Sequence, residues 1–335
     1  MAPAARRKAT YEAPPNIALV KYWGDRDRAR ALPCNSSISV TLDRLRSRTS
    51  VEFDPALADD TVELNGAAAV GGPRDAVVQF LDRVREMAGT TDRARVRSRN
   101  NFPTASGLAS SASGFAALAG AATSALGLEL SDRELSRLAR FGSGSAARSV
   151  FGGFVEWRAG TRADGSDCDA RELFGPHHWP ALRDLVVIVK AAPVKAVRSA
   201  DAMQATVATS PTYARRLAEL PRRIRAIRAA IGARDARRLF PLIMEECDSF
   251  REVCETTRPS LDYLTTTSRA LLGEVRSINR EAGRSVAGYT HDAGAHLHVF
   301  VLARDASRVR RRLASLPGVE RTLLLAPGPG GRRVH

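Results

Sequence analysis

The stretch from residue 94 to residue 126 constrains the fold most, because a strand, a turn of small residues and a buried helix follow one another in it. The basic run at 94–97 is typical of a strand, and the alanine-rich run at 115–126 is typical of a buried helix. A helix leaves its first four backbone N–H groups unpaired, and these donors together with the helix dipole attract a phosphate. In the turn, Gly107 allows the main chain to approach a ligand closely. Hydroxyl groups for phosphate oxygens or a magnesium ion come from Ser106, Ser110, Ser111 and Ser113.

This turn carries neither of two common nucleotide-binding sequences. The chain has no G-x-x-x-x-G-K-S/T, and the turn lacks the glycine fingerprint of dinucleotide-binding folds. From the residues alone, the turn predicts either a phosphate-binding loop or an ordinary loop that precedes a tightly packed helix.

Strand and helix patterns are mixed along the 335 residues without the strict alternation of a doubly wound sheet. The patterns predict strands near 16–20, 36–42, 50–53, 61–64, 94–97, 154–157, 185–189, 285–290, 297–301 and 321–325. Helical periodicity and caps predict helices near 73–87, 115–126, 131–142, 199–208, 211–231, 234–256, 261–282 and 306–316. We expect a disordered arm at 1–8, irregular structure at 159–180 and a flexible tail at 328–331. The pattern predicts an α+β fold of two halves, each a sheet covered by helices, with a ligand site in the cleft between them.

The formal net charge of +15 is compatible with a polyanionic partner. The basic residues are nearly all arginines on amphipathic helices, and only 6% of the residues are aromatic, too few for an obvious base-stacking platform. We therefore expect solvated arginine-rich faces and no nucleic-acid partner, while a phosphorylated small-molecule substrate suits the excess charge. No run of 18 apolar residues occurs, and the N-terminus has no apolar core behind its charges, so we expect no membrane span and no secretory signal.

The cysteines and histidines give no metal-binding signature. The four cysteines form no C-x-x-C pair, and we expect free thiols in a reducing cytoplasm. His296 and His298 would face one side of a strand. Without a suitable third ligand we interpret them as surface or packing residues.

The turn at 101–111, NFPTASGLASS, resembles the ATP-phosphate loop of the mevalonate diphosphate decarboxylases, which belong to the GHMP small-molecule kinase superfamily. Other patches resemble the same family: PNIALVKYWG at 15–24, LPCNSSISVTL at 32–42, SGSAARS at 143–149 with the strand through Trp157, and YTHDAG at 289–294. They stand in the expected order over nearly the whole chain. The chain is therefore identified as a member of this family.

The resemblance implies a two-lobed GHMP-kinase-like fold of mostly antiparallel sheets, with an ATP-binding domain at 1–183 and a second domain at 184–335. It implies a cytoplasmic homodimer that uses ATP and magnesium to phosphorylate a tertiary 3-hydroxyl, after which the 3-phosphate leaves as carbon dioxide departs and an isopentenyl product forms. Ser110 and Ser111 are the candidate magnesium ligands. The residues implied in ATP binding are Pro103, Ser106, Gly107, Leu108, Ala109, Ser110 and Ser111.

Three residues match the family's catalytic positions. Asp292 matches the essential aspartate, because a carboxylate must orient the 3-hydroxyl or take its proton. Lys21 matches the lysine that stabilises the phosphoryl group in transfer. Arg148 matches the arginine that holds the substrate carboxylate, where a planar guanidinium pairs bidentately. The residues implied in substrate binding are Asn16, Tyr22, Ser143, Gly144 and Ser145.

The chain departs from the family pattern at two places. Asp25 stands where the family usually has a lysine that contacts the terminal phosphates of the substrate. A carboxylate there would repel a diphosphate by about 1 kcal/mol or more, which makes mevalonate 5-phosphate an alternative to the 5-diphosphate unless Arg26 or Arg28 compensates. After Asp292, Ala295-His296 replaces the usual Pro-Asn, and the preceding His291 either tunes the carboxylate or faces away on the strand.

Three other functions remain open from the sequence. A related kinase would stop at the 3-phosphate, and a related decarboxylase would act on another 3-hydroxy acid. A basic nucleic-acid-binding module could use the same scaffold, because a fold alone does not determine function. The joint presence of Lys21, Arg148 and Asp292 favours the decarboxylase.

Overall fold

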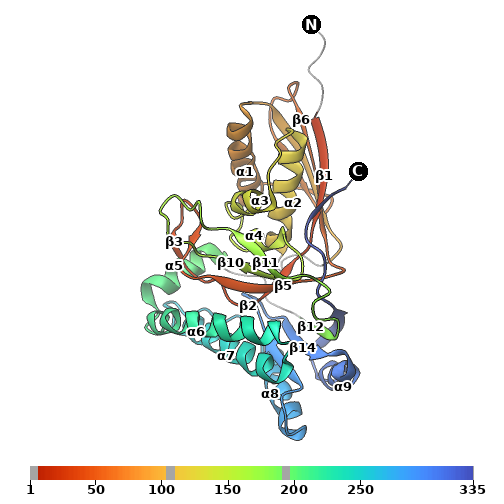
Figure 1. Ribbon diagram of the computed structural model, residues 1–335. Coiled ribbons are helices and arrows are strands. Elements are labelled where there is room, and N and C mark those ends of the chain that lie inside the picture. Colours follow the sequence, from red (N-terminus) through yellow and green to blue (C-terminus); the bar gives the residue numbers. More distant parts are fainter. Residues whose placement is uncertain (1–6, 103–109, 191–196, 335) are drawn as a thin grey trace.

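The computed structural model describes residues 7–102, 110–190 and 197–334, and Figure 1 shows their arrangement. Within these ranges the strands form a six-stranded sheet, two four-stranded sheets and a two-stranded ribbon. The six-stranded sheet has the order β16-β1-β6-β9-β7-β8, and the four-stranded sheets have the orders β11-β10-β5-β2 and β13-β14-β12-β15. Strand β7 pairs with β9 in parallel, and the other strand pairs of the described chain are antiparallel. The expected α+β architecture with mostly antiparallel sheets is confirmed.

The elements have the following bounds. The strands are β1 (Arg7–Ala13), β2 (Asn16–Val20), β3 (Asp25–Asp27), β4 (Leu32–Pro33), β5 (Ser37–Thr41), β6 (Ser47–Asp54), β7 (Thr61–Leu64), β8 (Ala67–Ala68), β9 (Arg93–Asn100), β10 (Phe154–Trp157), β11 (Ala170–Phe174), β12 (Leu182–Val189), β13 (Ala287–Thr290), β14 (Leu297–Leu302), β15 (Val319–Leu325) and β16 (Arg332–Val334). The helices are α1 (Gly72–Ala88), α2 (Ser110–Ala125), α3 (Asp132–Ala139), α4 (Ala146–Ser149), α5 (Ser199–Thr209), α6 (Tyr213–Gly232), α7 (Ala236–Glu255), α8 (Thr266–Glu281) and α9 (Ala303–Ala314).

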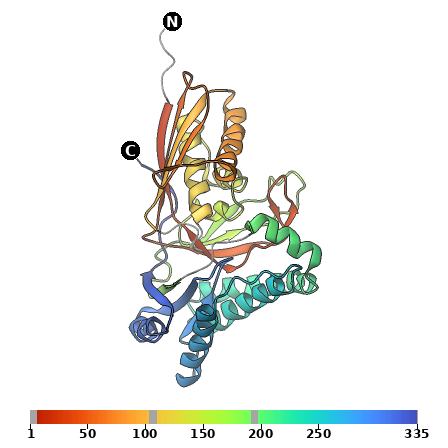
Figure 2. The ribbon, with the colours of Figure 1, turned by 180° about the vertical axis from the view of Figure 1, so that it is seen from behind.

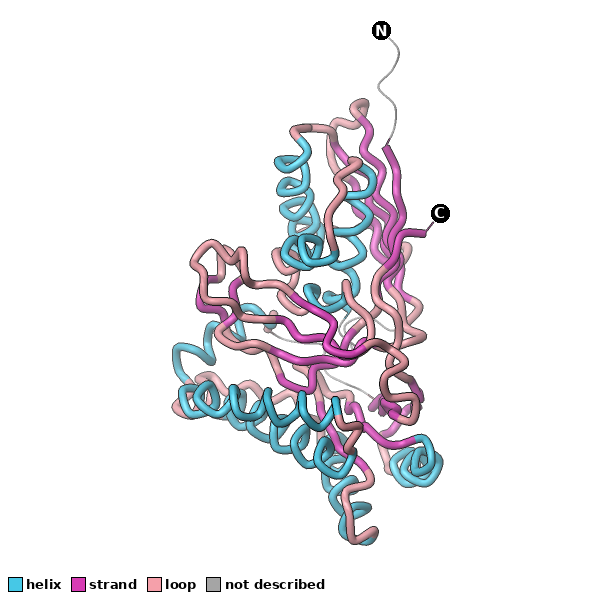
Figure 3. The backbone as a smooth tube through the Cα atoms, viewed as in Figure 1, coloured by secondary structure: helices cyan, strands magenta, loops and turns pink. Residues whose placement is uncertain are grey.

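The sheet β11-β10-β5-β2 lies in the middle of the molecule (Figures 1 and 3). On one side of it are helices α1 to α3 and the six-stranded sheet, and on the other side are helices α6 and α7. Strand β2 is buried along its whole length, and Ile17 and Leu19 share one hydrophobic core with Ile227 of α6 and Phe240 of α7. The N-terminal and C-terminal parts of the chain therefore pack against each other through a continuous apolar core, which fixes the end of β2 relative to the C-terminal sheet.

The C-terminal segment returns to the N-terminal sheet, so the expected flexible tail at 328–331 is wrong. Strand β16 pairs antiparallel with β1, and the views from both sides show the C-terminus beside that strand (Figures 1 and 2). The glycines permit this close packing, since a Cβ on Gly330 would lie 2.4 Å from the carbonyl oxygen of Val150. Arg7 and Lys8, expected in a disordered arm, are part of β1.

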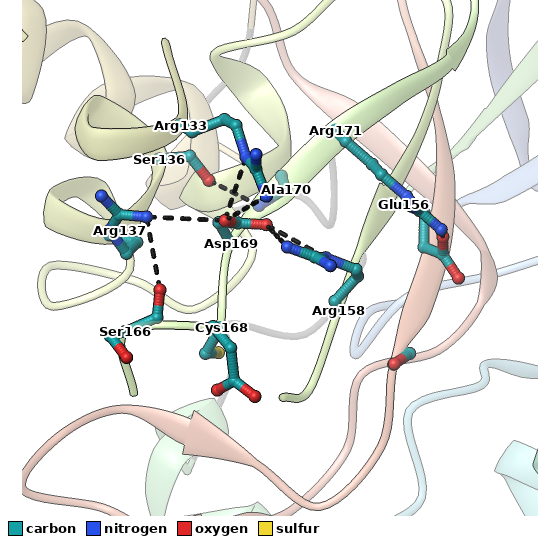
Figure 4. A network of polar contacts seen from close by, with 12 residues as sticks. Arg133, Ser136, Arg137, Glu156, Arg158, Ser166, Cys168, Asp169, Ala170 and Arg171 are labelled. Carbon is teal, nitrogen blue, oxygen red and sulfur yellow. Dashed lines mark hydrogen bonds and ion pairs between the residues drawn. The ribbon is translucent and has the colours of Figure 1, made fainter. Parts of the chain in front are cut away.

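Residues 159–180, expected to be irregular, include strand β11 and an ordered network around Asp169 (Figure 4). The Asp169 carboxylate is almost fully buried and pairs with Arg133, Arg137 and Arg158, from α3 and from the segment after β10. A buried carboxylate needs such partners, because desolvation of an unpaired charge is unfavourable. This network fixes the loop to helix α3.

The first residues of two helices, α3 and α8, can be compared with the predicted ones. The capping box of Ser131 and Glu134 is present at the start of α3. Helix α8 starts at Thr266 and not at 261, because the Thr265 side chain caps it through Ser268. Among the residues that the structure describes, no helix is both long and apolar enough to cross a bilayer.

Candidate active site

Lys21 and Asp292 meet where the middle sheet contacts the C-terminal sheet. Lys21 directly follows β2 and Asp292 comes two residues after β13, and the Lys21 Nζ lies 2.7 Å from the Asp292 Oδ1. The Lys21 side chain is 3% exposed and the Asp292 side chain 27% exposed, so the ammonium is buried behind a carboxylate that solvent reaches. The Thr290 hydroxyl donates to the Ala18 carbonyl at 3.4 Å and joins the two strands beside this pair.

The charge of Asp292 is controlled by its neighbours. Burial acts to raise its pKa, but the charge and hydrogen bond of Lys21, helped by His298 and Arg148, hold the pKa of Asp292 below its ordinary value. The carboxylate is therefore ionised at neutral pH and can only accept hydrogen bonds. This is the state that a group needs if it is to orient a hydroxyl or remove its proton.

Arg148 is a buried cation without a carboxylate partner in the described part of the chain. It lies in α4, is 3% exposed, and donates from Nε to the Asn16 Oδ1 at 2.9 Å and from Nη1 to the Ser37 Oγ at 2.6 Å. Burial lowers its pKa to about 10, although the charge of Asp292 acts to raise it, so the guanidinium stays charged at pH 7. Buried charges are normally paired. A guanidinium held by neutral acceptors is suited to receive an anionic ligand.

The candidate substrate-binding residues gather around the start of α4. Asn16 donates to the Ser149 Oγ at 2.8 Å and to the Ser145 carbonyl at 3.2 Å, so the same amide both accepts from Arg148 and is anchored to its helix. The hydroxyls of Ser143 and Ser145 lie 3.2 Å apart. This set of hydroxyl and amide groups next to a buried guanidinium has the chemistry that phosphate or carboxylate oxygens require.

Tyr22 packs over Gly144 and is tied to Asp25. Its ring meets the Trp157 ring edge-on at 4.8 Å, and a Cβ on Gly144 would lie 2.6 Å from the Tyr22 ring, so a larger residue would displace the tyrosine. The Tyr22 hydroxyl donates to the Asp25 Oδ1 at 2.5 Å. Burial raises the pKa of Asp25, while the Tyr22 hydrogen bond and the charge of Arg28 oppose that effect.

Arg26 and Arg28, the candidates to offset the negative charge of Asp25, form hydrogen bonds with other residues. Arg28 donates to Gln204 at 2.5 Å and to Asp201 at 2.9 Å on α5. Arg26 donates to the carbonyls of Ala159 and Arg162, each at 3.2 Å. Of the two, Arg28 acts on the pKa of Asp25 through its charge.

The predicted strand and the predicted buried helix are present as β9 and α2, while residues 103–109 between them lie outside the described residues. Ser110 and Ser111 begin α2, whose first turn carries no acidic side chain, so nothing negative in that turn opposes a phosphate. The Ser113 hydroxyl is buried and bonded to the Ser47 hydroxyl at 2.7 Å, which corrects its assignment as a phosphate ligand. Five predicted ATP-binding residues lie outside the described residues: Pro103, Ser106, Gly107, Leu108 and Ala109.

His291, His296 and His298 are buried, and the first two are neutral at pH 7. Burial lowers the pKa of His291 and of His296 to about 4 each. The Nδ1 of His296 accepts from the Val189 N–H at 3.3 Å, and the Nδ1 of His298 lies 2.7 Å from an Asp184 oxygen. In residues 7–102, 110–190 and 197–334, no group of three His, Cys, Asp or Glu side chains could hold a metal ion.

Two contacts of this site were not predicted from the sequence. Ser37 accepts from Arg148, and the sequence signals were its place in an alternating strand and in the family-like patch at 32–42. Glu246 is fully buried in α7 and accepts from the Lys21 backbone N–H at 2.9 Å. It falls in the apolar stripe that contains Leu239, Ile243 and Phe250, and a carboxylate at a core position was a signal that the sequence did contain.

Two family models together match most of this chain. Residues 13–170 match a diphosphomevalonate decarboxylase-like N-terminal domain, and residues 185–322 match a mevalonate 5-diphosphate decarboxylase C-terminal domain. A diphosphomevalonate decarboxylase of Aspergillus fumigatus is 41% identical over 327 residues, which cover 93% of this chain and 81% of the relative. The diphosphomevalonate decarboxylase of Saccharomyces cerevisiae is 38% identical over 328 residues, which cover 92% of this chain and 83% of the relative.

Solved structures are similar over the whole fold. One, described as MDDEF in complex with MVAPP, AMPPCP and magnesium, superposes with a TM-score of 0.92 at 36% identity and covers 98% of this chain and 99% of the other. Mevalonate diphosphate decarboxylase from Staphylococcus aureus superposes with a TM-score of 0.92 at 34% identity and covers 99% of each chain. The likeness therefore extends over both the middle sheet and the C-terminal sheet, which contribute Lys21 and Asp292.

Proposed function

This chain belongs to the diphosphomevalonate decarboxylase family and is an ATP-dependent carboxy-lyase of the mevalonate pathway, and we propose that Lys21, Arg148 and Asp292 are the centre of its active site. The observation that carries this proposal is the pairing of a charged, solvent-reachable Asp292 with Lys21, beside a buried guanidinium that no described carboxylate neutralises. An anionic substrate would complete the charge balance of this site.

Each residue has a role that follows from its place. The substrate carboxylate pairs with Arg148, which leaves the tertiary 3-hydroxyl at Asp292. Asp292 orients this hydroxyl and accepts its proton as the oxygen bonds to the transferred phosphorus, and ADP is released. Lys21 keeps Asp292 ionised and stabilises the negative charge of the phosphoryl group. The 3-phosphate then leaves with the electrons of its C–O bond, the bond to the carboxylate carbon breaks, and its electrons form the new double bond as carbon dioxide departs.

ATP and magnesium belong to this reaction, and the described residues fit them at the start of α2. The first turn of α2 is free of acidic side chains, and Ser110 and Ser111 stand at its N-terminus. ATP supplies the phosphoryl group, and magnesium neutralises charge on its phosphates. We assign the hydroxyls of Ser110 and Ser111 to the magnesium ion or to phosphate oxygens, together with the predicted ATP-binding residues outside the described ranges.

For the substrate we propose mevalonate 5-diphosphate, with the 5-phosphate as the alternative. The diphosphate is supported by the names of the relatives and by the solved complex with MVAPP. The monophosphate is favoured by one observation, the Asp25 carboxylate beside Tyr22. The diphosphate remains compatible with the site for two reasons. The Tyr22 hydrogen bond occupies one oxygen of the Asp25 carboxylate, and the hydroxyls of Ser143 and Ser145 would contact the phosphates.

The test offers mevalonate, its 5-phosphate and its 5-diphosphate separately with ATP and magnesium, and follows ADP, carbon dioxide and the organic product. Isopentenyl diphosphate from the diphosphate alone is the expected result. Isopentenyl phosphate from the monophosphate would assign the altered specificity to Asp25. ADP without carbon dioxide would replace the decarboxylase with a kinase, and no turnover of any of the three would point to another 3-hydroxy acid.

We further propose two domains, 1–183 and 184–335, a homodimer and a cytoplasmic location. The two-domain division is supported by the separate family matches at 13–170 and 185–322, although β16 pairs with the first sheet. Light scattering of the purified protein tests the dimer. The nucleic-acid alternative predicts salt-dependent oligonucleotide binding, which we expect to be absent at physiological salt.

A further inference from the structure

Glu246 is a buried carboxylate that the proposed reaction does not use. It lies in α7 with no exposed surface, and its Oε1 accepts from the Lys21 backbone N–H at 2.9 Å. Arg216 and Arg223 of α6, each 2% exposed, pair with the same carboxylate. These two arginines are two helical turns apart and face α7 from the same side of α6. The carboxylate therefore joins the contact between α6 and α7 to the end of strand β2.

The Lys21 backbone is held by side chains at both of its polar groups. Strand β2 ends at Val20, whose partner on β5 is Ile38, so the Lys21 N–H lies beyond the ladder and bonds to Glu246 instead. The Lys21 carbonyl accepts from the Asn35 Nδ2 at 2.9 Å. These two contacts define the position from which the Lys21 side chain reaches Asp292.

Helix packing alone would not require this particular arrangement. Glu219 of α6 and Glu245 of α7 also pair with Arg223 and are about half exposed, so Glu245 supplies an ordinary ion pair between α6 and α7 and Glu219 supplies one within α6. Glu246 differs from both because it is fully buried and one of its oxygens, which also pairs with Arg216, accepts from the backbone N–H that directly follows strand β2. A charged hydrogen bond to backbone N–H is short and directional, which suits the fixing of a geometry.

We propose that Glu246, with Asn35, is a positioning residue that holds the Lys21 main chain so that its ammonium meets Asp292. This inference rests on the proposed roles of Lys21 and Asp292. Because a misplacement of about 1 Å costs about 100-fold in rate at well-aligned sites, the contact between α6 and α7 sets the rate of the reaction without touching the substrate.

The test compares two substitutions of Glu246 that separate length from charge. Glu246→Asp keeps a buried negative charge beside Arg216 and Arg223, but its shorter side chain cannot reach both these arginines and the Lys21 N–H. Glu246→Gln keeps the length and an oxygen for that N–H but removes the charge. We expect Glu246→Gln to lose more stability and Glu246→Asp to lose more kcat, by at least about tenfold, with KM for the phosphorylated substrate changed less than about threefold.

The pH profile supplies a readout that a merely structural role would not move. Asp292 faces Lys21, Arg148 and His298, and His291 is its neighbour in sequence. Of these groups, Lys21 is the one that Glu246 touches, so in Glu246→Asp the acid limb of the kcat profile should move to higher pH as Asp292 loses the attraction that lowers its pKa. In Glu245→Gln, the matched control on the same helix, kcat and the acid limb should stay at the parent values.

Each outcome distinguishes the inference from the proposed function. If Lys21→Met is inactive, the proposed site stands. The positioning role is then wrong if the kcat losses of the Glu246 variants follow their stability losses, or if the acid limb stays in place in Glu246→Asp. If Lys21→Met keeps its turnover, the proposed role of Lys21 fails, and the inference fails with it. If neither Glu246 variant folds, Asn35→Ala removes the other backbone contact, and an unchanged kcat and acid limb there would overturn the inference.

Discussion

Replacing Arg148 with glutamine should remove most of the activity and leave the fold about as stable as before. Burial lowers the pKa of Arg148 well below its ordinary value, to about 10. Since each pKa unit corresponds to about 1.4 kcal/mol, holding the charge in the protein costs about 3 kcal/mol. The lost hydrogen bonds to Asn16 and Ser37 are worth a similar amount, about 1.5 kcal/mol each. The two effects offset, and we expect the free energy of unfolding to change by less than about 1 kcal/mol.

The activity should fall steeply, because the substrate carboxylate loses its charged partner. Two charged hydrogen bonds of about 1.5–3 kcal/mol each correspond to a loss of roughly 10²–10⁴-fold in kcat/KM. Coupled measurement of ADP release gives kcat/KM, and urea unfolding gives the stability of the same preparation.

Arg85 provides the matched control, since it is also a buried arginine but has a buried partner. It is 5% exposed and pairs with Asp60, which is fully buried at its side chain. Breaking such a pair costs about 3–5 kcal/mol, so Arg85→Gln should be destabilised and keep its kcat/KM per folded molecule. The reasoning about Arg148 is refuted if Arg148→Gln loses as much stability as Arg85→Gln or retains its kcat/KM.

The remaining predictions concern Asp292, His291 and Asp169. Asp292→Asn should lower kcat by about 10²–10⁴-fold, because the amide cannot take the hydroxyl proton, and release of carbon dioxide measures the loss. Burial lowers the pKa of His291 in the folded state to about 4, below the 6.5 of the unfolded chain, so the unfolded chain takes up a proton at higher pH. The contribution of His291 to stability is therefore complete above pH 6.5, and the free energy of unfolding should fall by about 3 kcal/mol as the pH drops to 4. Urea unfolding between pH 7 and pH 4.5 should therefore show a shallower fall in His291→Asn than in the parent, and equal slopes would contradict the burial argument. Asp169→Asn leaves three partly exposed arginines without their carboxylate and should cost about 2 kcal/mol of stability with little change in kcat.

The parts of the fold that were predicted from the sequence have strong local signals. The capping box of Ser131 places the start of α3, and the alanine-rich run places α2. The tail at 328–331 and strand β11 were missed for a physical reason, since both are held by contacts with distant residues. The glycines that suggest a flexible tail instead allow close packing against Val150, and Asp169 organises the preceding loop through three arginines.

The candidate site was found by resemblance and not by spacing. Lys21 and Asp292 are 271 residues apart, and no local pattern brings them together. The structure adds what the motifs do not contain, namely the neutral partners of Arg148 and the buried Glu246 behind Lys21. A carboxylate in an apolar helix stripe is the kind of signal that would have identified Glu246 in advance.

The most direct test of the account is the stoichiometry of ADP, phosphate and carbon dioxide released from mevalonate 5-diphosphate, measured in the parent and in Asp292→Asn. The account predicts one of each per isopentenyl diphosphate in the parent, and a common loss of all three products in the variant. Release of ADP without phosphate and carbon dioxide, or unchanged turnover in Asp292→Asn, would contradict it.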